Sequence, residues 1–160
     1  MAGITFTPIG VVRSPFRDPR NMPVQPVGAR GVRGTIELDP AYAAGLKDLA
    51  GFSRIILLYH FHRSEGYALE VVPFLDTTPH GVFATRAPRR PNAVGLSILR
   101  LVSVEGATLH VEDVDILDGT PVLDIKPYVP AFDAYPDERS GWLAAAGDGP
   151  RTMRSDDRFC

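Results

Sequence analysis

The sequence contains a single cysteine, Cys160, which excludes an intramolecular disulfide and a zinc site built from cysteines. A reducing, cytoplasmic setting is the expected location. No stretch approaches the roughly 18 uninterrupted apolar residues of a transmembrane helix. The first residues also lack a basic segment followed by an apolar run. We therefore expect neither export nor contact with a membrane.

A large net charge of one sign is also lacking. Seventeen basic residues stand against nineteen acidic ones, so the formal charge of −2 creates no global field that attracts nucleic acid. Any contact with RNA must therefore be local. Lysine occurs only at Lys47 and Lys126, so the other 15 of the 17 cations are arginines. Many of them gather in two groups, at Arg13, Arg17, Arg20, Arg30 and Arg33 and at Arg86, Arg89 and Arg90.

A glycine-rich turn between a first strand and a helix is missing as well. Such a turn, with an acidic residue further along the chain, marks the doubly wound domains that bind many nucleotide cofactors. Gly28, Gly31 and Gly34 are spaced three apart, but arginines lie among them and no helical pattern follows. The sequence also contains no internal repeat. A doubly wound nucleotide-binding domain is therefore not predicted.

Short β-rich runs dominate the chain, and Gly, Pro and Asp-Gly pairs separate them. This pattern predicts a mainly β protein, a small single-sheeted β-barrel or tightly curled sheet, with one or two short helices. The expected strands are residues 4–13, 32–38, 53–61, 69–72, 81–86, 96–104, 108–116 and 122–125. One helix is expected over residues 41–50, with Asp39 as its N-cap and Pro40 at its first position. A second is expected over residues 138–146.

The length predicts one domain, which we place at residues 1–146. Residues 1–3 and 147–160 are expected to be frayed termini, and the second segment is predicted to be a flexible tail because it is rich in Gly, Asp, Arg and Ser.

The apolar run of residues 55–59 predicts a central strand that is buried on both faces. His60 and His62 follow it, and residues two apart on a strand point to the same side. This pair does not predict a metal site, because no third ligand of suitable spacing accompanies it. Further along the chain, Asp124 is read as a structural residue or as an ion-pair partner of Lys126.

Residues 81–97 carry the strongest functional signal. Three arginines, two prolines and an asparagine lie there between two short apolar runs. Pro88 and Pro91 fix their own backbone and restrict the residue before each of them, so the loop is stiff. A stiff arginine-rich loop presents guanidinium groups to phosphate, carboxylate or a purine face. The alternative is a solvated turn with incidental charges.

This loop and residues 115–128 together resemble the signature of the TsaA-like, or TrmO, family. The family runs have the forms GVFATRSPxRPNPIGLS and D-x-x-DGTPVxDIKPY, in the same order along the chain. Residues 8–15, 23–26 and 52–63 add to the resemblance, which spans residues 4–145. It implies a tRNA methyltransferase that uses S-adenosylmethionine and acts on N6 of the threonylcarbamoyl-modified adenosine beside the anticodon. The extra C-terminal domain of some longer members is not expected here.

The resemblance also implies where the cofactor binds. Family members are single-sheeted β-barrels that hold S-adenosylmethionine with loops, in a pocket between the two subunits of a homodimer. The implied cofactor-binding residues are Pro23, Val24, Gln25, His62, Arg63, Arg86, Leu96, Asp115, Ile116, Leu117, Asp118 and Gly119. A carboxylate suits ribose hydroxyls or the ammonium group, and an arginine suits the methionine carboxylate. Asp118-Gly119 is also a common turn pair, so turn formation stays an alternative for Asp118.

Methyl transfer from a sulfonium depends mainly on in-line approach, to which positioning of both reactants can contribute about 7–11 kcal/mol. The acylated target nitrogen is weakly nucleophilic, so a general base could add about 10²–10⁴-fold. The sequence does not identify the catalytic residue. His62 is a candidate base, whereas Asn92 and Tyr128 are candidates for orienting hydrogen bonds. Arg89, Arg90 and Asn92 are expected to bind the substrate.

Two other classes of function stay open at this point. One is a methyltransferase for a small-molecule acceptor on the same scaffold, which the net acidity favours. The other is a non-catalytic RNA-binding β-barrel, which would bind RNA in a salt-dependent way but would not bind the cofactor.

Overall fold

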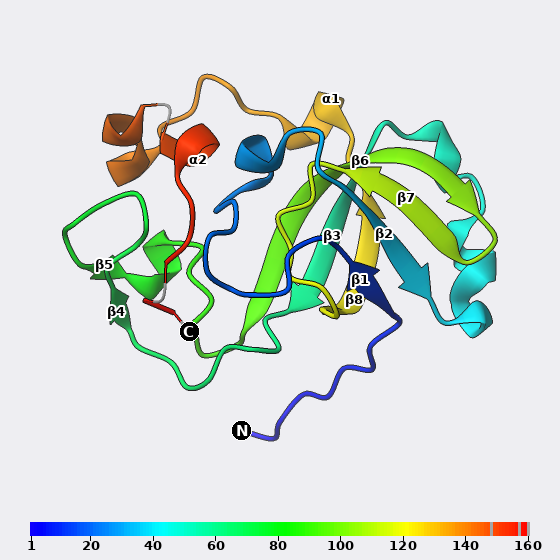
Figure 1. Cartoon of the computed structure of the whole chain (residues 1–160), viewed down its shortest axis with the longest axis horizontal. Coiled ribbons are helices and arrows are strands. Elements are labelled where there is room, and N and C mark those ends of the chain that lie inside the picture. Colours follow the sequence, from blue (N-terminus) through cyan, green and yellow to red (C-terminus); the bar gives the residue numbers. More distant parts are fainter. Residues whose placement is uncertain (148, 157, 160) are drawn as a thin grey trace.

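A closed, six-stranded antiparallel β-barrel forms the body of the protein (Figure 1). The computed structural model describes residues 1–147, 149–156, 158 and 159. Neighbouring strands pair in the order β1-β2-β7-β6-β3-β8, and β8 returns to β1. The strands are β1 (Gly10–Arg13), β2 (Arg33–Leu38), β3 (Arg54–His60), β6 (Val94–Glu105), β7 (Thr108–Glu112) and β8 (Pro121–Pro127). The predicted mainly β, single-sheeted barrel is confirmed.

Alternating side chains of these strands fill the interior of the barrel. In β3, Ile55, Leu57 and Tyr59 are buried, whereas Ile56 and Leu58 are half-buried on the outside. The prediction that this strand is buried on both faces is wrong, because a closed barrel has one interior and the outer face of each strand lies at the surface. Residues that complete the core include Val12, Ile36, Leu99, Leu109, Val111 and Val122.

Three predicted strands are much shorter than expected, and residues 32–38, 53–61 and 69–72 lose one or two residues each. The first begins at Gly10 and not at residue 4. Beyond β7, Asp113 adopts a left-handed backbone conformation with a φ of 67°, which ends the strand before residues 114–116. Residues 81–86 form only the end of β5 (His80–Gly81) and a 3-10 turn, η4 (Val82–Ala84). Thr85 stabilises that turn, because its Oγ1 donates a hydrogen bond to the Val82 carbonyl at 2.8 Å.

The helix predicted over residues 41–50 is a pair of 3-10 helices, η2 (Pro40–Leu46) and η3 (Leu49–Gly51). Asp48, with a φ of 67°, interrupts the continuous helix. The predicted Asp39 cap is confirmed, since its carboxylate accepts a hydrogen bond from the Ala41 amide. The second predicted helix is the 3-10 helix η5 (Gly141–Ala146). Among the described residues, no helix is long and apolar enough to cross a membrane.

The remaining short elements lie beside the barrel. They are η1 (Pro26–Ala29), the two-stranded sheet of β4 (Glu70–Val71) with β5, α1 (Pro130–Asp133) and α2 (Gly149–Thr152). Figure 1 shows the β4–β5 sheet and α2 on the same side of the barrel. Val71, Val82 and Ala87 form a second small core there. The loops outside the barrel therefore have apolar support of their own.

The described residues of the predicted tail pack beside the barrel, on the side where the β4–β5 sheet lies. Ser155 exchanges backbone hydrogen bonds with Asn21 and Met22, and its Oγ donates to the Pro19 carbonyl at 2.7 Å. Phe159 contacts the ring of Phe74 edge to face. Residues 148, 157 and 160 of the predicted tail, Cys160 among them, lie outside the described residues. The flexibility of the segment stays a prediction, but its described residues have defined partners.

Asp113 connects the end of β7 to two other parts of the barrel. Its carboxylate accepts a hydrogen bond from the Gly31 amide at 2.8 Å and pairs with Arg54 at 3.1 Å.

We expect Asp113→Ala to destabilise the fold by about 1–3 kcal/mol, because alanine removes both interactions and disfavours the left-handed backbone. Asp113→Asn keeps the acceptor and tolerates that backbone, so its cost should stay below about 1 kcal/mol. Urea unfolding of both variants measures the difference, and equal losses would contradict this role.

Candidate functional site

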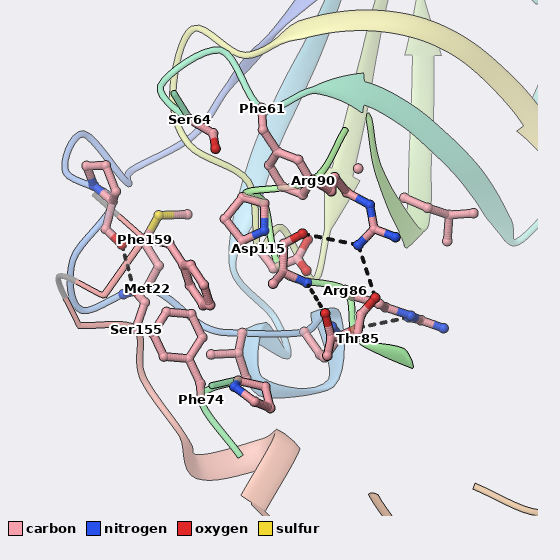
Figure 2. Close-up of a pocket in the computed structure, with 18 of the residues that line it drawn as sticks. Met22, Phe61, Ser64, Phe74, Thr85, Arg86, Arg90, Asp115, Ser155 and Phe159 are labelled. Carbon is pink, nitrogen blue, oxygen red and sulfur yellow. Dashed lines mark hydrogen bonds between the residues drawn. The ribbon is translucent and has the colours of Figure 1, made fainter. Parts of the chain in front are cut away.

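A pocket of about 750 Å³ lies where the end of β3 and the start of β6 meet the surrounding loops. This volume falls in the usual range for small-molecule sites, about 300–1,000 Å³. Figure 2 shows Met22, Ser155, Phe74 and Phe159 toward one side, and Thr85, Arg86 and Arg90 toward the other. The first group comes from the N-terminal loop, the segment after β4 and the C-terminal segment, and the second comes from the arginine-rich loop. The barrel therefore supplies the floor, and loops distant in sequence supply the walls.

Most of the predicted cofactor-binding residues meet in this pocket. The N-terminal loop, the turn after β3, the arginine-rich loop, β6 and the segment after β7 each contribute at least one of them. The predicted residues that line the pocket are Pro23, Val24, Gln25, His62, Arg63, Arg86, Leu96, Asp115, Ile116 and Leu117.

Asp118 and Gly119 do not line the pocket. The Asp118 carboxylate accepts a hydrogen bond from the Ser14 amide at 3.1 Å, and its own amide donates to the Phe16 carbonyl. Gly119 has a φ of 80°, a conformation that glycine adopts without steric cost. These contacts support the turn-forming alternative for this pair.

Asp115 is the acidic group at the end of a chain of buried hydroxyls. The Ser97 hydroxyl donates to Oδ1 of Asp115 at 2.7 Å, and the Tyr59 hydroxyl lies 3.0 Å from the same serine oxygen. Burial raises the pKa of Asp115 to about 7, although the hydrogen bond from Ser97 and the charge of Arg86 act in the opposite direction. Burial also raises the pKa of Tyr59, so this phenol stays protonated. Asp115 is thus a carboxyl group whose charge changes near neutral pH.

The arginines of the stiff loop play different structural roles. Arg86 is exposed, and its Nη1 donates to the Gln25 side chain at 3.0 Å across the pocket rim. Arg90 is half-buried, and its Nη1 donates to the carbonyls of Thr85 and Ala87 at 3.0 and 3.1 Å. Arg90 therefore supports the loop from within, while Arg86 presents its guanidinium at the opening.

The candidates for catalysis and substrate binding are not brought together. His62 lines the pocket, and burial together with the nearby charges of Arg63 and His60 lowers its pKa, so it is neutral at pH 7. Arg89, Asn92 and Tyr128 are not among the residues that line this pocket. The premise that His60 and His62 lie on one strand is wrong, because β3 ends at His60 and a turn follows. The described residues hold no group of three potential metal ligands.

Sequence reasoning missed several residues of the pocket. Tyr59 and Ser97 were read only as parts of strands, although hydroxyls in apolar runs were a usable signal. Trp142, the single tryptophan, lines the wall and donates a hydrogen bond to the Ala84 carbonyl at 2.8 Å. Ser155 and Phe159 come from the predicted tail. No local sequence pattern indicated Ser155 and Phe159, because their contacts join residues more than 80 positions apart in the sequence.

The pocket therefore combines three chemical features. Aromatic, aliphatic and proline side chains form most of its walls, Asp115 supplies an acceptor, and Arg86 supplies a guanidinium at the rim. This combination suits a mid-sized ligand that has an apolar face, hydrogen-bond donors and an anionic end. A neutral imidazole at His62 adds a group able to take up a proton.

Residues 11–134 match the family model described as the tRNA-methyltransferase O N-terminal domain. A Pyrococcus abyssi protein named as a probable S-adenosyl-L-methionine-binding protein is 50% identical over 98% of this chain and 85% of its own. The tRNA (adenine(37)-N6)-methyltransferase of Escherichia coli is 34% identical over 91% of this chain and 66% of its own. The crystal structure of TrmO from Pseudomonas aeruginosa superposes with a TM-score of 0.74 and 41% identity, covering 88% of this chain and 63% of its own. The chain thus spans about two thirds of the E. coli enzyme and slightly less of the crystallised protein. The match to the family model, with these relatives, establishes that the chain belongs to the TrmO family.

Proposed function

We propose that this protein is an S-adenosylmethionine-dependent methyltransferase whose acceptor is the N6 of the threonylcarbamoyl-modified adenosine next to the tRNA anticodon. The observation that carries the proposal is the gathering of ten predicted cofactor-binding residues around one pocket that holds an acceptor and a guanidinium. The names of the P. abyssi and E. coli relatives support the cofactor and the class of substrate, respectively.

The residues in the pocket fit the chemistry of this cofactor. Asp115 would accept from the ribose hydroxyls or the ammonium group, and Arg86 would pair with the methionine carboxylate. Apolar side chains such as Leu96, Ile116 and Leu117 would pack against the adenine. When bound, S-adenosylmethionine supplies an electrophilic methyl group on a positively charged sulfur.

The contribution of the protein is mainly to position groups. The loop that carries Arg86 is fixed by Pro88 and by the two hydrogen bonds of Arg90 to its carbonyls, so the guanidinium at the rim has a defined place. Pre-organisation of this kind lowers the barrier without any acid or base. His62, neutral at pH 7, is a pocket residue able to accept the proton of the acceptor nitrogen.

The test is incubation of the purified protein with isotopically labelled S-adenosylmethionine and unmodified or threonylcarbamoyl-modified tRNA, followed by mass spectrometry of the nucleosides. Label on the modified adenosine alone is the expected result. Label on a small-molecule acceptor only would favour the second class of methyltransferase. Calorimetry with S-adenosylmethionine and S-adenosylhomocysteine completes the test, since a folded protein that binds neither at millimolar concentration is not a methyltransferase.

Arg86 offers a sharper prediction for the cofactor site. We expect Arg86→Ala to weaken S-adenosylmethionine binding by about tenfold, because one charge-assisted contact at an exposed rim contributes about 1.5 kcal/mol. Arg86→Lys keeps the charge but loses the planar fork, so it should restore only part of the affinity. The exposed Arg100, which lies outside the pocket, is a matched control whose change to alanine should leave binding unaltered. Equal affinities for all four proteins, measured by calorimetry, would remove Arg86 from the site.

Homodimer formation and a cytoplasmic location belong to the same proposal. Val94 and Leu96 are exposed apolar residues on β6, and both line the pocket. A second subunit would cover such residues, and two-fold pairing is the commonest symmetry of soluble assemblies. Light scattering in the presence of cofactor measures the mass, and a strict monomer across micromolar concentrations would count against a shared pocket.

A further inference from the structure

Three side chains from separate parts of the barrel form a continuous hydrogen-bonded chain that ends in the pocket. Tyr59 lies at the end of β3, Ser97 near the start of β6, and Asp115 after β7. Tyr59 is 6% exposed and Ser97 only 1% exposed. Asp115 lines the pocket. The two hydroxyls are thus buried in the barrel, and the carboxyl is their outlet to the site.

The donors and acceptors in this hydrogen-bonded chain follow from the number of hydrogens on each group. The Ser97 hydroxyl has one hydrogen, which it donates to Oδ1 of Asp115. When Asp115 is ionised, the contact between Tyr59 and Ser97 therefore uses the phenol hydrogen, and Tyr59 donates to the serine oxygen at 3.0 Å. Both donors are oriented toward the carboxyl group. This arrangement favours negative charge on Asp115, whereas burial opposes it.

We propose that Tyr59 and Ser97 are positioning residues that hold Asp115 as an ionisable acceptor, and that ligand binding in the pocket releases the proton of Asp115 to solvent. This inference rests on the proposed cofactor function, because hydroxyl or ammonium donors of the ligand would face the carboxylate. The proton balance is simple: the carboxylic acid loses its proton to water, and the carboxylate that results accepts hydrogen bonds from the ligand.

Among the residues that the structure describes, few other titratable groups surround Asp115. Arg86 faces it from the arginine-rich loop and favours its charged form, and Tyr59 faces it from β3. The other ionisable residues of the pocket are His62, Arg63, Arg90 and Asp156. Burial outweighs the opposing charge of Arg86 and raises the pKa of Asp115 to about 7. Small changes in its hydroxyl partners should move that equilibrium.

The first experiment needs no ligand. Carbon-detected NMR of the aspartate carboxyls in the free protein follows the titration of Asp115, and Asp115→Asn identifies its signal. We expect a midpoint near pH 7 that moves upward in Ser97→Ala and, by less, in Tyr59→Phe, since both changes remove stabilisation of the carboxylate. Tyr59→Phe keeps the ring and its edge contact with Phe61, so it separates the hydroxyl from packing. A midpoint near pH 4, or one unmoved by both variants, would overturn the positioning role.

The second experiment measures proton release on binding of S-adenosylhomocysteine, by calorimetry in two buffers of different ionisation enthalpy. At pH 7 the wild type should release about half a proton more than Asp115→Asn, because half of its Asp115 side chains start protonated. Ser97→Ala should release more than the wild type at this pH. Equal release by the wild type and Asp115→Asn would overturn the linkage. Absence of binding in all variants would instead overturn the cofactor proposal, and the NMR titration would still decide the role of the two hydroxyls.

Discussion

Replacement of Asp115 by alanine is expected to weaken S-adenosylmethionine binding by about 30- to 4,000-fold. Truncation of one partner of a buried charged hydrogen bond costs about 2–5 kcal/mol, and each 1.4 kcal/mol is a factor of ten in affinity. The change also leaves the Ser97 hydroxyl without its acceptor. Calorimetry at pH 8 is the measurement, because Asp115 is mostly ionised there.

Asp115→Asn is the matched control for this prediction. Asparagine keeps an oxygen that accepts from Ser97 but has no charge, so its affinity should lie between those of the wild type and Asp115→Ala. The control also separates binding from folding. The pKa of Asp115 is raised from 3.8 to about 7. Between these two pH values the folded state binds more protons than the unfolded state, so the stability of the fold decreases as the pH rises from 3.8 to about 7.

Asp115→Asn removes that loss, so the variant should be at least as stable as the wild type at pH 8. Thermal unfolding at pH 5 and pH 8 checks the expectation. If Asp115→Asn and Asp115→Ala both bind S-adenosylmethionine within threefold of the wild type, Asp115 does not contact the ligand.

The fold was predictable because a barrel leaves local traces in sequence. Period-two burial in strands such as Arg54–His60 and turn residues between them follow from neighbours along the chain. The cap at Asp39 and the pairing of Lys126 with Asp124, at 2.7 Å, were predicted for the same reason. The endings of β7 and η2 were not, because Asp113 and Asp48 adopt left-handed conformations that sequence alone did not indicate.

The site was predictable only where the family resemblance supplied positions. It named Asp115 and Arg86, which the structure brings to one pocket. It gave no hint of Ser155, whose side chain is linked to Met22 over 133 residues, because such contacts depend on how the chain closes on itself. Tyr59 and Ser97 were missed for a related reason: their meeting follows from the pairing of β3 with β6, in which Leu57 lies opposite Ser97 and Tyr59 opposite Gly95.

That pairing makes Gly95 the second position with a large expected effect. A Cβ atom at Gly95 would lie 2.6 Å from Cζ of Tyr59 and 2.9 Å from Cζ of Phe61, well inside van der Waals contact. The Tyr59 ring is confined by the barrel core and by its edge contact with Phe61, at 5.5 Å between ring centroids. Glycine is therefore required here because a ring occupies the space that a side chain would need.

We expect Gly95→Ala to destabilise the protein by about 2–6 kcal/mol. Overpacking of a core contributes about 1–3 kcal/mol, and displacement of the Tyr59 hydroxyl from Ser97 adds about 1–3 kcal/mol for the buried groups left unsatisfied. Urea unfolding gives the magnitude. Gly81→Ala is the control, because Gly81 also lies in a strand, β5, and a Cβ there meets no atom of the described residues within 4 Å. Its cost should be close to zero.

A second change tests whether the loss arises from the Tyr59 ring. In a Tyr59→Ala background the Tyr59 ring is gone and only Cζ of Phe61, at 2.9 Å, stays close to a Cβ at residue 95. The additional cost of Gly95→Ala should therefore fall well below its cost in the wild type, and the coupling between the two positions should be correspondingly large. Gly95→Ala should also raise the midpoint of the Asp115 titration, because Tyr59 no longer supports Ser97. If the two substitutions prove additive, the close approach of Tyr59 to Gly95 does not limit stability, and the geometry of the hydroxyl chain must depend on other contacts of Ser97.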